Sequence, residues 1–347
     1  MNDKWHSFLN NIGAHIDNGM VTNFGNINKE LESDASSDII VDLSTTSIIK
    51  VTGEDATNFL HNQLTNDLKA LAPGQSQLSG YCSPKGRLLA LFRIVAQDDG
   101  YLLILPQELA TPTLKRLRMF VMMSKVSLED ISGELAHIGL SGPGITSALE
   151  QQLEIEVPAL NTAATTDSLT IVHVPGSASR FQVFGEVSAL IQLWQALTDN
   201  VTAVGTGVWE RLNIEAGLPV IYKETVEAFV PQMVNLQAVG GLSFTKGCYP
   251  GQEVVARMQY LGKLKRRMFI ASVESELCPS PGDPIVTPDK EGERKTGQIV
   301  AAQPAAGGQV KLIAVIEIAS AENSPLHLQS PAGSALKLEA LPYSLDD

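Results

Sequence analysis

Apolar residues alternate with polar ones along some segments of the chain and recur every three to four positions along others. Residues 47–53 (SIIKVTG) have the alternation of a strand. Phe59, Leu60, Leu64 and Leu68 follow with the spacing of one helix face. The first well-patterned part of the chain is therefore predicted to be a strand followed by a helix.

Three more strands are predicted within residues 77–106, separated by two turns. The turns are indicated by SPKG at 83–86 and DDG at 98–100, where Pro and Gly interrupt the apolar runs. A helix near 107–122 and a strand at 125–130 follow. Together these elements predict a mixed α+β unit with antiparallel strands.

The same kinds of element then occur a second time. Residues 134–153 predict a strand, a turn and a helix, and further strands are predicted at 169–175 and 180–186. An amphipathic helix is predicted at 187–199. Two successive α+β units of this size suggest two related small domains.

The two ends of the chain differ from these units. After about residue 265 the chain consists of strand-like segments separated by Pro and Gly, which predicts a small antiparallel barrel or sandwich. Residues 1–35 are expected to be a loosely packed N-terminal segment. The fold class predicted for the whole chain is α+β.

Composition and charge fit a globular protein. Of the 347 residues, 44% are apolar and 18% are charged, and the net charge is -13. An acidic chain repels nucleic acid on average, so we expect no strong direct nucleic-acid binding outside a local basic patch. Residues 246–267 carry six basic side chains and one acidic one. This basic stripe suits the binding of a polyanionic small molecule or a phosphate backbone. The alternative is a solvated helix end together with a strand edge whose charges prevent pairing with another chain.

Cysteine and histidine usage bears on compartment and metal binding. The three cysteines, Cys82, Cys248 and Cys278, are far apart and odd in number, which favours a reducing compartment. The six histidines have no ligand spacing and no CxxC pair occurs, so no metal site is expected. The N-terminus lacks the pattern of a signal peptide, and no apolar run is suited to a membrane. We therefore expect a cytoplasmic protein without a membrane partner.

Residues 246–257 (KGCYPGQEVVAR) are the strongest local candidate for chemistry. Pro250-Gly251 predicts a turn, Gln252 begins a helix, and Glu253 and Arg257 are placed to pair four residues apart. Cys248 follows Lys246 by two positions, and a nearby cation stabilises a thiolate. The alternative is that Cys248 is a small buried residue in a structural turn, since free cysteine is often buried.

The chain resembles the YgfZ family of folate-binding proteins, which are relatives of the glycine-cleavage T-protein. The resemblance covers most of the chain from about residue 40. It is carried by VTGEDATNFLHNQLTNDL (51–68), GYCSPKGRLLALFRI (80–94), WERLNIEAGLPVI (209–221), FVPQMVNLQAVGGLSFTKGC (229–248), FTKGCYPGQEVVAR (244–257) and LPYSLDD (341–347).

The resemblance implies a ring of three domains with a folate in a central channel. Two domains would be interleaved and ferredoxin-like within residues 36–260, and the third would be a C-terminal antiparallel β-barrel at 261–347. It also implies a role in maintaining iron–sulfur enzymes, notably those that methylthiolate tRNA, which would be transient partners. The family's signature residues fall on Lys246, Gly247, Cys248, Tyr249, Gly251, Gln252 and Glu253.

The same resemblance suggests where the folate binds. The folate-contacting tryptophan of the family falls on Trp209, and a flat pterin stacks well on an indole. A second such tryptophan is expected on the first strand, where counting back from Gly53 reaches Thr46. The folate glutamate tail, or a partner, would be held by the basic stripe, which includes Arg257.

One departure bears on the reaction. The T-protein has paired acids in the strand after its first hairpin glycine, where this chain has Ala90 and Leu91. Without a carboxylate, acid–base assistance for aminomethyl transfer is missing, so a classical aminomethyltransferase is not expected. The leading hypothesis is a folate-binding accessory protein for iron–sulfur-dependent tRNA modification. A tetrahydrofolate-dependent aminomethyltransferase and an iron–sulfur scaffold are the alternatives.

Overall fold

The computed structural model describes residues 1–260, 262–289 and 292–345. By their contacts the residues form two compact units, each built from several stretches of the chain. Unit 1 contains Met1–Phe59, Lys69–Gln77 and Arg93–Leu212, and unit 2 contains Leu60–Leu68, Leu78–Phe92 and Asn213–Asp347. The domain limits expected from the sequence stay a prediction.

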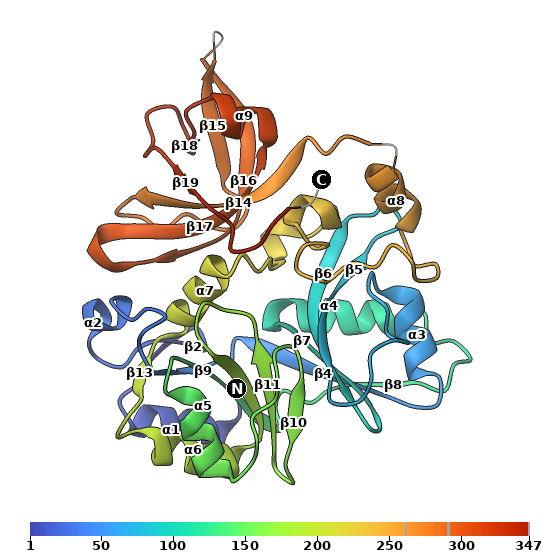
Figure 1. The fold of residues 1–347 in the computed structure, drawn as a ribbon, viewed down its shortest axis with the longest axis vertical. Helices are drawn as coiled ribbons and strands as arrows, with labels where there is room; N and C mark the ends of the chain where they lie inside the picture. Colours follow the sequence, from blue (N-terminus) through green and yellow to red (C-terminus); the bar gives the residue numbers. More distant parts are fainter. Residues whose placement is uncertain (261, 290–291, 346–347) are drawn as a thin grey trace. The chain divides into compact units, whose positions relative to one another are not determined.

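Unit 1 is built around sheet 1, whose strands lie in the order β10-β11-β12-β9-β3-β13. The neighbours pair antiparallel, except that β13 runs parallel to β3. Figure 1 shows these strands beside helices α1, α5 and α6. The strands are β3 (Ile39–Asp42), β9 (Leu135–Ser141), β10 (Ala163–Thr165), β11 (Leu169–Val174), β12 (Arg180–Glu186) and β13 (Thr202–Val204).

Sheet 1 buries both of its faces because apolar residues occupy both sets of alternating positions. One face packs Ile138 and Phe181 into a core with α1 (Asp3–Asn11), α5 (Ile145–Leu153) and α6 (Val187–Leu197). The opposite face contributes to a second core, whose buried members include Val41, Val172, Phe184, Trp209, Ile48 and Leu102.

Residues 1–35 are packed more tightly than the sequence analysis predicts. Trp5 and Leu9 of α1 are completely buried, and Trp5 Nε1 donates a hydrogen bond of 2.7 Å to Asp42 Oδ1. The Trp5 ring also meets Trp194 edge-on, with centroids 5.8 Å apart. The expectation of loose packing was wrong because α1 supplies part of the first core. The elements that follow are β1 (His15–Asp17), β2 (Met20–Asn23) and α2 (Ile27–Leu31).

Sheet 2 has the strand order β5-β6-β7-β4-β8. It confirms the strands and turns predicted for residues 47–130. The strands are β4 (Thr46–Thr52), β5 (Ser76–Cys82), β6 (Leu88–Gln97), β7 (Gly100–Pro106) and β8 (Ser127–Asp130). The helix predicted after the first strand is α3 (Ala56–Gln63), which is shorter than expected because it ends before Leu64 and Leu68. The helix predicted near 107–122 is α4 (Gln107–Arg118), and α7 (Thr206–Glu215) begins in unit 1.

Unit 2 contains sheet 3, an antiparallel sheet in the order β18-β15-β16-β17-β14-β19. In Figure 1 it is the curled orange and red sheet, a half-barrel where the sequence predicts a barrel. The strands are β14 (Arg266–Glu274), β15 (Pro284–Asp289), β16 (Gly292–Pro304), β17 (Gln309–Glu317), β18 (His327–Leu328) and β19 (Lys337–Glu339). Helices α8 (Gln252–Tyr260) and α9 (Ile318–Asn323) belong to the same unit, with short 3₁₀ turns at Lys223–Thr225, Pro231–Val234 and Ala306–Gly308.

The predicted α+β fold class is confirmed. Its finer arrangement, with two interleaved ferredoxin-like domains and a ring of three domains, stays a prediction. Within the residues that the structure describes, no helix is both long and apolar enough to cross a membrane.

Candidate functional site

The candidate site is the Cys loop, residues 243–251 of unit 2. Cys248 is exposed at its centre. The side chains on either side, Lys246 and Tyr249, are each only 7% exposed. Two inward-pointing side chains therefore hold the loop, and the cysteine between them faces outward. The alternative of a buried structural cysteine does not describe Cys248 in this structure.

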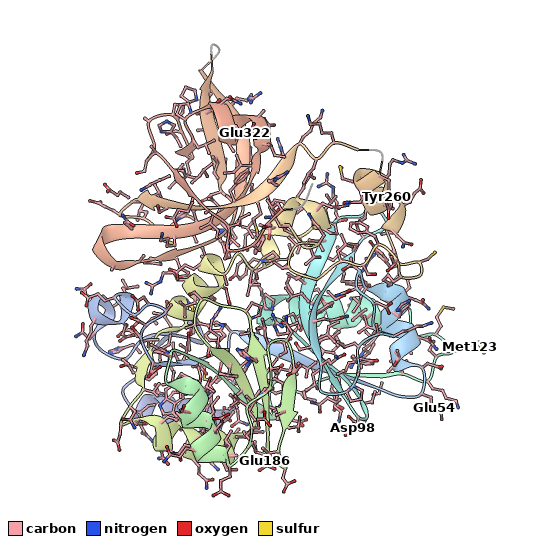
Figure 2. All side chains as sticks on the ribbon, viewed as in Figure 1. Glu54, Asp98, Met123, Glu186, Tyr260 and Glu322 are labelled. Atoms are coloured by element: carbon pink, nitrogen blue, oxygen red, sulfur yellow. The ribbon has the colours of Figure 1, made fainter. Side chains whose placement is uncertain are left out.

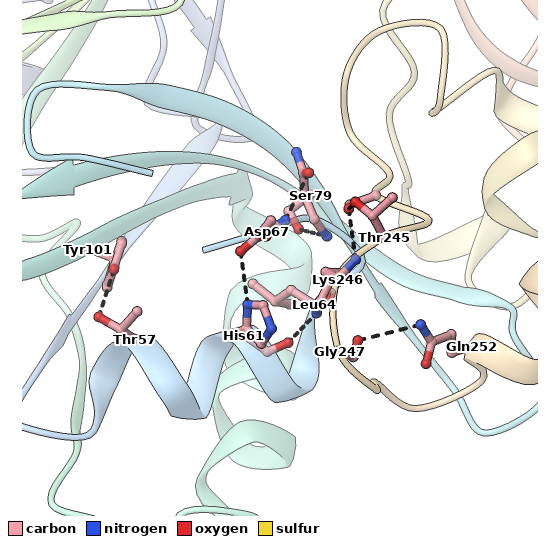
Figure 3. A network of polar contacts seen from close by, with 12 residues as sticks. Thr57, His61, Leu64, Asp67, Ser79, Tyr101, Thr245, Lys246, Gly247 and Gln252 are labelled. Carbon is pink, nitrogen blue, oxygen red and sulfur yellow. Dashed lines mark hydrogen bonds and ion pairs between the residues drawn. The ribbon is translucent and has the colours of Figure 1, made fainter. Parts of the chain in front are cut away.

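The ammonium group of Lys246 is bound at the end of helix α3. Its Nζ donates hydrogen bonds to the carbonyl oxygens of His61 and Leu64, the latter at 2.6 Å (Figure 3). The last carbonyls of a helix lack partners within the helix and carry partial negative charge, so a cation there is favoured. Nζ also lies 4.9 Å from the centroid of the Tyr249 ring. Stabilisation of a Cys248 thiolate by Lys246 stays a prediction.

Gly251 fixes the other end of the loop against the hairpin that joins β5 and β6. It has φ +82°, and a Cβ built on it would lie 2.5 Å from the Ser83 carbonyl oxygen and 2.6 Å from Gly86. Both neighbours are backbone atoms, which cannot rotate away. The turn predicted at Pro250-Gly251 thus depends on glycine for its conformation and for its close approach.

We expect Gly251→Ala to lower the free energy of unfolding by about 2 kcal/mol, because it adds strain and a backbone clash. Urea denaturation measures this loss. Gly307→Ala is the matched control, since Gly307 has φ +70° with nothing within 4 Å of its Cβ position. The control isolates the cost of the left-handed backbone, and we expect about 1 kcal/mol for it. Equal losses in the two variants would show that the hairpin contact is unimportant.

Cys82 lies beneath the loop and differs from Cys248. It is completely buried, and burial raises the pKa of its thiol to about 12. Burial, and secondly the charge of Cys82, also raise the pKa of the Tyr249 phenol. Both groups are therefore neutral at physiological pH. Of the three cysteines, only Cys248 and Cys278 are exposed.

Helix α8 continues from the loop and contains three predicted site residues. Gln252 Nε2 donates to the Gly247 carbonyl oxygen at 3.5 Å. The predicted pairing is confirmed, since Arg257 Nη2 lies 2.6 Å from Glu253 Oε1. Both members of this pair are mostly exposed, so it contributes little to stability. The helix ends at Tyr260, labelled in Figure 2, which is 69% exposed.

The basic stripe carries less unpaired charge than its sequence indicates. Lys246 is buried at the end of α3, and Arg257 is paired with Glu253. Arg266 forms a second ion pair, with Glu317 at 2.8 Å. Binding of a folate tail or a partner by the stripe stays a prediction.

Trp209 belongs to unit 1 and lies in its second core. It is 3% exposed. Its ring packs on the backbone at Gly139, where a Cβ would come within 2.6 Å of it, and the Arg180 guanidinium carbon lies 4.0 Å from the ring centroid. A pterin could stack on this indole only if a covering side chain moved. Folate stacking on Trp209 stays a prediction.

Thr46 lines a cavity of about 390 Å³ in unit 1. Its hydroxyl donates to the Leu43 carbonyl oxygen at 2.7 Å and also lies 2.7 Å from His137 Nδ1. Since the hydroxyl has one proton, we assign the imidazole proton to Nδ1, which leaves Nε2 as an acceptor. The polar side chains of the lining are Ser44, Thr46, Ser47, Gln107, Thr111, Asp130, Ser132 and His137.

The imidazole of His137 is a buried acceptor beside this cavity. It is 4% exposed, and burial lowers its pKa to about 3, so it is neutral at physiological pH. Among the described residues, Nε2 has no hydrogen-bond partner. His137, which lines the cavity, and Gly139, which contacts Trp209, lie two residues apart on β9. They are therefore on the same face of sheet 1.

The positions where the T-protein has paired acids are apolar and buried. Ala90 and Leu91 on β6 are 0% and 6% exposed. Within the described parts of the chain, no group of three His, Cys, Asp or Glu side chains could hold a metal ion.

Two histidines near these sites were not predicted from the sequence. His61 lies under the Cys loop, and His137 lines the cavity. Neither has a local motif around it, because each acquires its partners from residues far away in the chain. Lys246 and His61, for example, are 185 positions apart.

Comparison with known proteins identifies a matching family model, related sequences and a solved structure with the same fold. The model of the GCVT N-terminal domain family matches residues 14–242. A curated protein of Colwellia psychrerythraea named tRNA-modifying protein YgfZ is 32% identical over 307 residues, which cover 88% of this chain and 93% of that protein. Its namesake from Klebsiella pneumoniae is 31% identical over 87% of this chain and 91% of that protein.

The fold is also that of a solved enzyme. Aminomethyltransferase T of the glycine cleavage system from Bartonella henselae superposes with a TM-score of 0.77 over 99% of this chain and 97% of that one. The two sequences are 17% identical, so this likeness concerns the fold alone.

Proposed function

Because the chain belongs to the YgfZ family, we propose that it is a folate-binding accessory protein that supports tRNA modification by iron–sulfur enzymes. The names of the relatives support the part that concerns tRNA. More specifically, the proposed role is in the methylthiolation of tRNA and in the maintenance of the enzymes that perform it. Cys248 would be the reactive thiol of the protein.

The cavity beside Thr46 is the observation that carries the folate part. Its volume, about 390 Å³, is in the range of small-molecule pockets. A pterin presents amino and ring N–H donors and carbonyl and ring-nitrogen acceptors. The cavity offers acceptors for the pterin donors in the Asp130 carboxylate, in His137 Nε2, and in the Ser44 and Thr46 hydroxyl oxygens, whose own protons are donated to Asp42 and to the Leu43 carbonyl oxygen. These residues would hold the pterin, and bound folate would supply a carrier of one-carbon units.

Calorimetric titration with folate and with tetrahydrofolate tests this part. We expect the unmodified protein to bind at least one of them and Thr46→Val to bind it about tenfold more weakly, because a hydrogen bond is lost. Thr202→Val, at an exposed position of β13, is the matched control and should bind normally. If the unmodified protein binds neither folate, this part of the proposal is wrong.

Trp209→Phe separates the two expectations for the pterin. Phenylalanine preserves a ring in the core but removes the indole. If the pterin stacks on Trp209, the variant will bind folate more weakly, and quenching of tryptophan fluorescence by folate will be reduced. If the pterin occupies the cavity alone, affinity will be unchanged.

Aminomethyl transfer is not included in the proposal. The buried pair Ala90 and Leu91 offers no carboxylate to assist that reaction. An assay for methylenetetrahydrofolate formed from an aminomethyl donor checks this point, and turnover at rates like those of the T-protein would contradict it.

We expect Cys248→Ser to reduce methylthiolated tRNA severalfold in cells that lack the native protein, while leaving the melting temperature nearly unchanged. Serine has nearly the same size, and Cys248 is exposed, so little packing is lost. Mass spectrometry of tRNA nucleosides measures the effect. Cys278→Ser, the other exposed cysteine, is the matched control and should complement fully. Full complementation by Cys248→Ser would show that the loop serves structure alone.

A further inference from the structure

Arg93 is a buried cation on strand β6, in unit 1. Its side chain is 7% exposed, and in sheet 2 it lies opposite Ile104 of β7. Ile104 and Val95, which is two positions further along β6, are members of the second core. The Arg93 side chain is therefore on the face of the sheet that packs into this core. Burial lowers the pKa of its guanidinium to about 10, so the group is still charged at physiological pH.

Within the part of the chain that the structure describes, no carboxylate pairs with this guanidinium. Its hydrogen bonds are two from Nη1, to Ser76 Oγ at 3.2 Å and to Asn161 Oδ1 at 3.3 Å. Both acceptors are neutral, and both distances are at or beyond the upper end of the usual range for N–H···O bonds. A buried charge is costly unless it is paired. The fold therefore holds a positive charge that its own side chains do not neutralise.

The hydrogen-bonding groups that remain available around Arg93 are donors. With Nη1 occupied, the N–H groups of Nε and Nη2 are left, and these point side by side, which is the geometry that binds two oxygens of a carboxylate or a phosphate. Ser76 Oγ and Asn161 Oδ1 both accept from Arg93. The Ser76 hydroxyl proton and the Asn161 Nδ2 protons therefore have no acceptor among the described residues. A set of donors that includes a cation suits an oxyanion.

Backbone hydrogen bonds fix the positions of the two neutral residues. The Ser76 amide donates to the Asn161 carbonyl oxygen at 2.8 Å, and the Asn161 amide donates to the His173 carbonyl oxygen at 3.0 Å. Asn161 has φ +58°, a left-handed conformation that asparagine adopts more readily than most residues. Ser76 is buried, whereas Asn161 is exposed. The donors are therefore arranged before a ligand binds, and the group extends from the interior to the surface of unit 1.

We propose that Arg93, Ser76 and Asn161 form a binding site for the oxyanion group, a carboxylate or a phosphate, of a small molecule. The proposal goes beyond the function proposed above and does not depend on it. Arg93 would hold two oxygens of the anion through Nε and Nη2, and the Ser76 hydroxyl and the Asn161 amide would donate to the same group. The net charge of the chain, -13, repels anions in general, so binding depends on these local donors.

The test is NMR of the arginine Nε–H groups in protein that is isotope-labelled at its arginines. The Arg93 resonance, assigned by its absence from Arg93→Lys, is followed during titration with sodium phosphate and with sodium acetate, while sodium chloride keeps the ionic strength constant. We expect a saturable shift with at least one of these anions. Tighter binding of phosphate identifies a phosphate ester as the ligand class, and tighter binding of acetate identifies a carboxylate. Arg118 is the matched control, since it is an exposed arginine of unit 1 that also donates to a neutral oxygen, and its resonance should shift little.

Two variants separate anion binding from a purely structural role of Arg93. Asn161→Asp preserves shape and places a carboxylate of the chain itself beside the guanidinium. It should weaken anion binding at least roughly tenfold. It should also raise the urea midpoint in chloride buffer, because the buried charge gains a partner. Ser76→Ala removes one donor, preserves the cation and should weaken binding roughly threefold to tenfold. Urea denaturation also confirms that each variant is folded.

Each outcome supports or overturns the site. A saturable shift of the Arg93 resonance that is lost in Asn161→Asp and weakened in Ser76→Ala supports it. If neither anion shifts this resonance, or if Arg93 and Arg118 respond alike, the anions bind adventitiously and the proposal is wrong. If Asn161→Asp binds the anion as tightly as the unmodified protein, the anion does not lie between these side chains, and the proposal is equally wrong.

Discussion

Lowering the pH from 7 to 4 should reduce the free energy of unfolding by about 3 kcal/mol through His137 alone. Burial lowers the pKa of His137 to about 3 in the folded protein, whereas an unfolded histidine has a pKa near about 6.5. Between these values the unfolded chain binds the additional proton. The stability that neutral His137 provides is therefore complete above about pH 6.5 and is lost as the pH falls toward 3.

Urea denaturation at a series of pH values, on the unmodified protein and on His137→Gln, measures this contribution. The variant should be less stable at pH 7 and should lose less stability on acidification. The difference between the two curves is needed because other groups titrate as well. Burial raises the pKa of Asp42, for example, which favours the folded state as the pH falls. Parallel curves would show that His137 is not held neutral by the fold.

Trp209→Ala should reduce the free energy of unfolding by about 3–5 kcal/mol, the usual cost of removing a large aromatic side chain from a core. The ring is 3% exposed, it fills the space that Gly139 leaves open, and it lies against the Arg180 guanidinium. Removing it leaves a cavity and takes a cation–π contact from a buried cation. Trp209→Phe should cost less, because much of the volume is preserved.

Thermal and urea denaturation of the two variants measure these losses. A loss below about 1 kcal/mol for Trp209→Ala would show that the ring is not part of the core. The result also determines how folate assays are interpreted. Loss of binding in an unstable Trp209→Ala protein would not identify a stacking platform, so Trp209→Phe is the variant suited to that question.

The local features of the Cys loop could be predicted from the sequence. A turn at Pro250-Gly251, a helix start at Gln252 and a pairing of Glu253 with Arg257 depend on residues within four positions of one another. Backbone conformation and helix spacing determine such features almost independently of the rest of the protein. The strands and helices of residues 47–199 were predictable for the same reason, since apolar periodicity is a local property.

The distant contacts of the loop could not be predicted in this way. From the sequence, Lys246 is a cation two residues from Cys248, yet packing directs it to carbonyls 182 and 185 positions away. His61 becomes a neighbour of Gly247 by the same packing. A lysine or a histidine has no apolar period that would indicate which way it points.

The sequence by itself determined the fold class, the order of the elements and the family, because periodic patterns and a contiguous motif survive in the order of the residues. Tertiary structure alone decided which side chains are enclosed. Trp5 and Trp209 are core residues, Cys248 is exposed between two buried neighbours, and Thr46 shares a cavity with His137. The physical reason is that burial depends on which surfaces the folded chain brings together, and an aromatic or polar residue has the same local signature in a core as in a binding site.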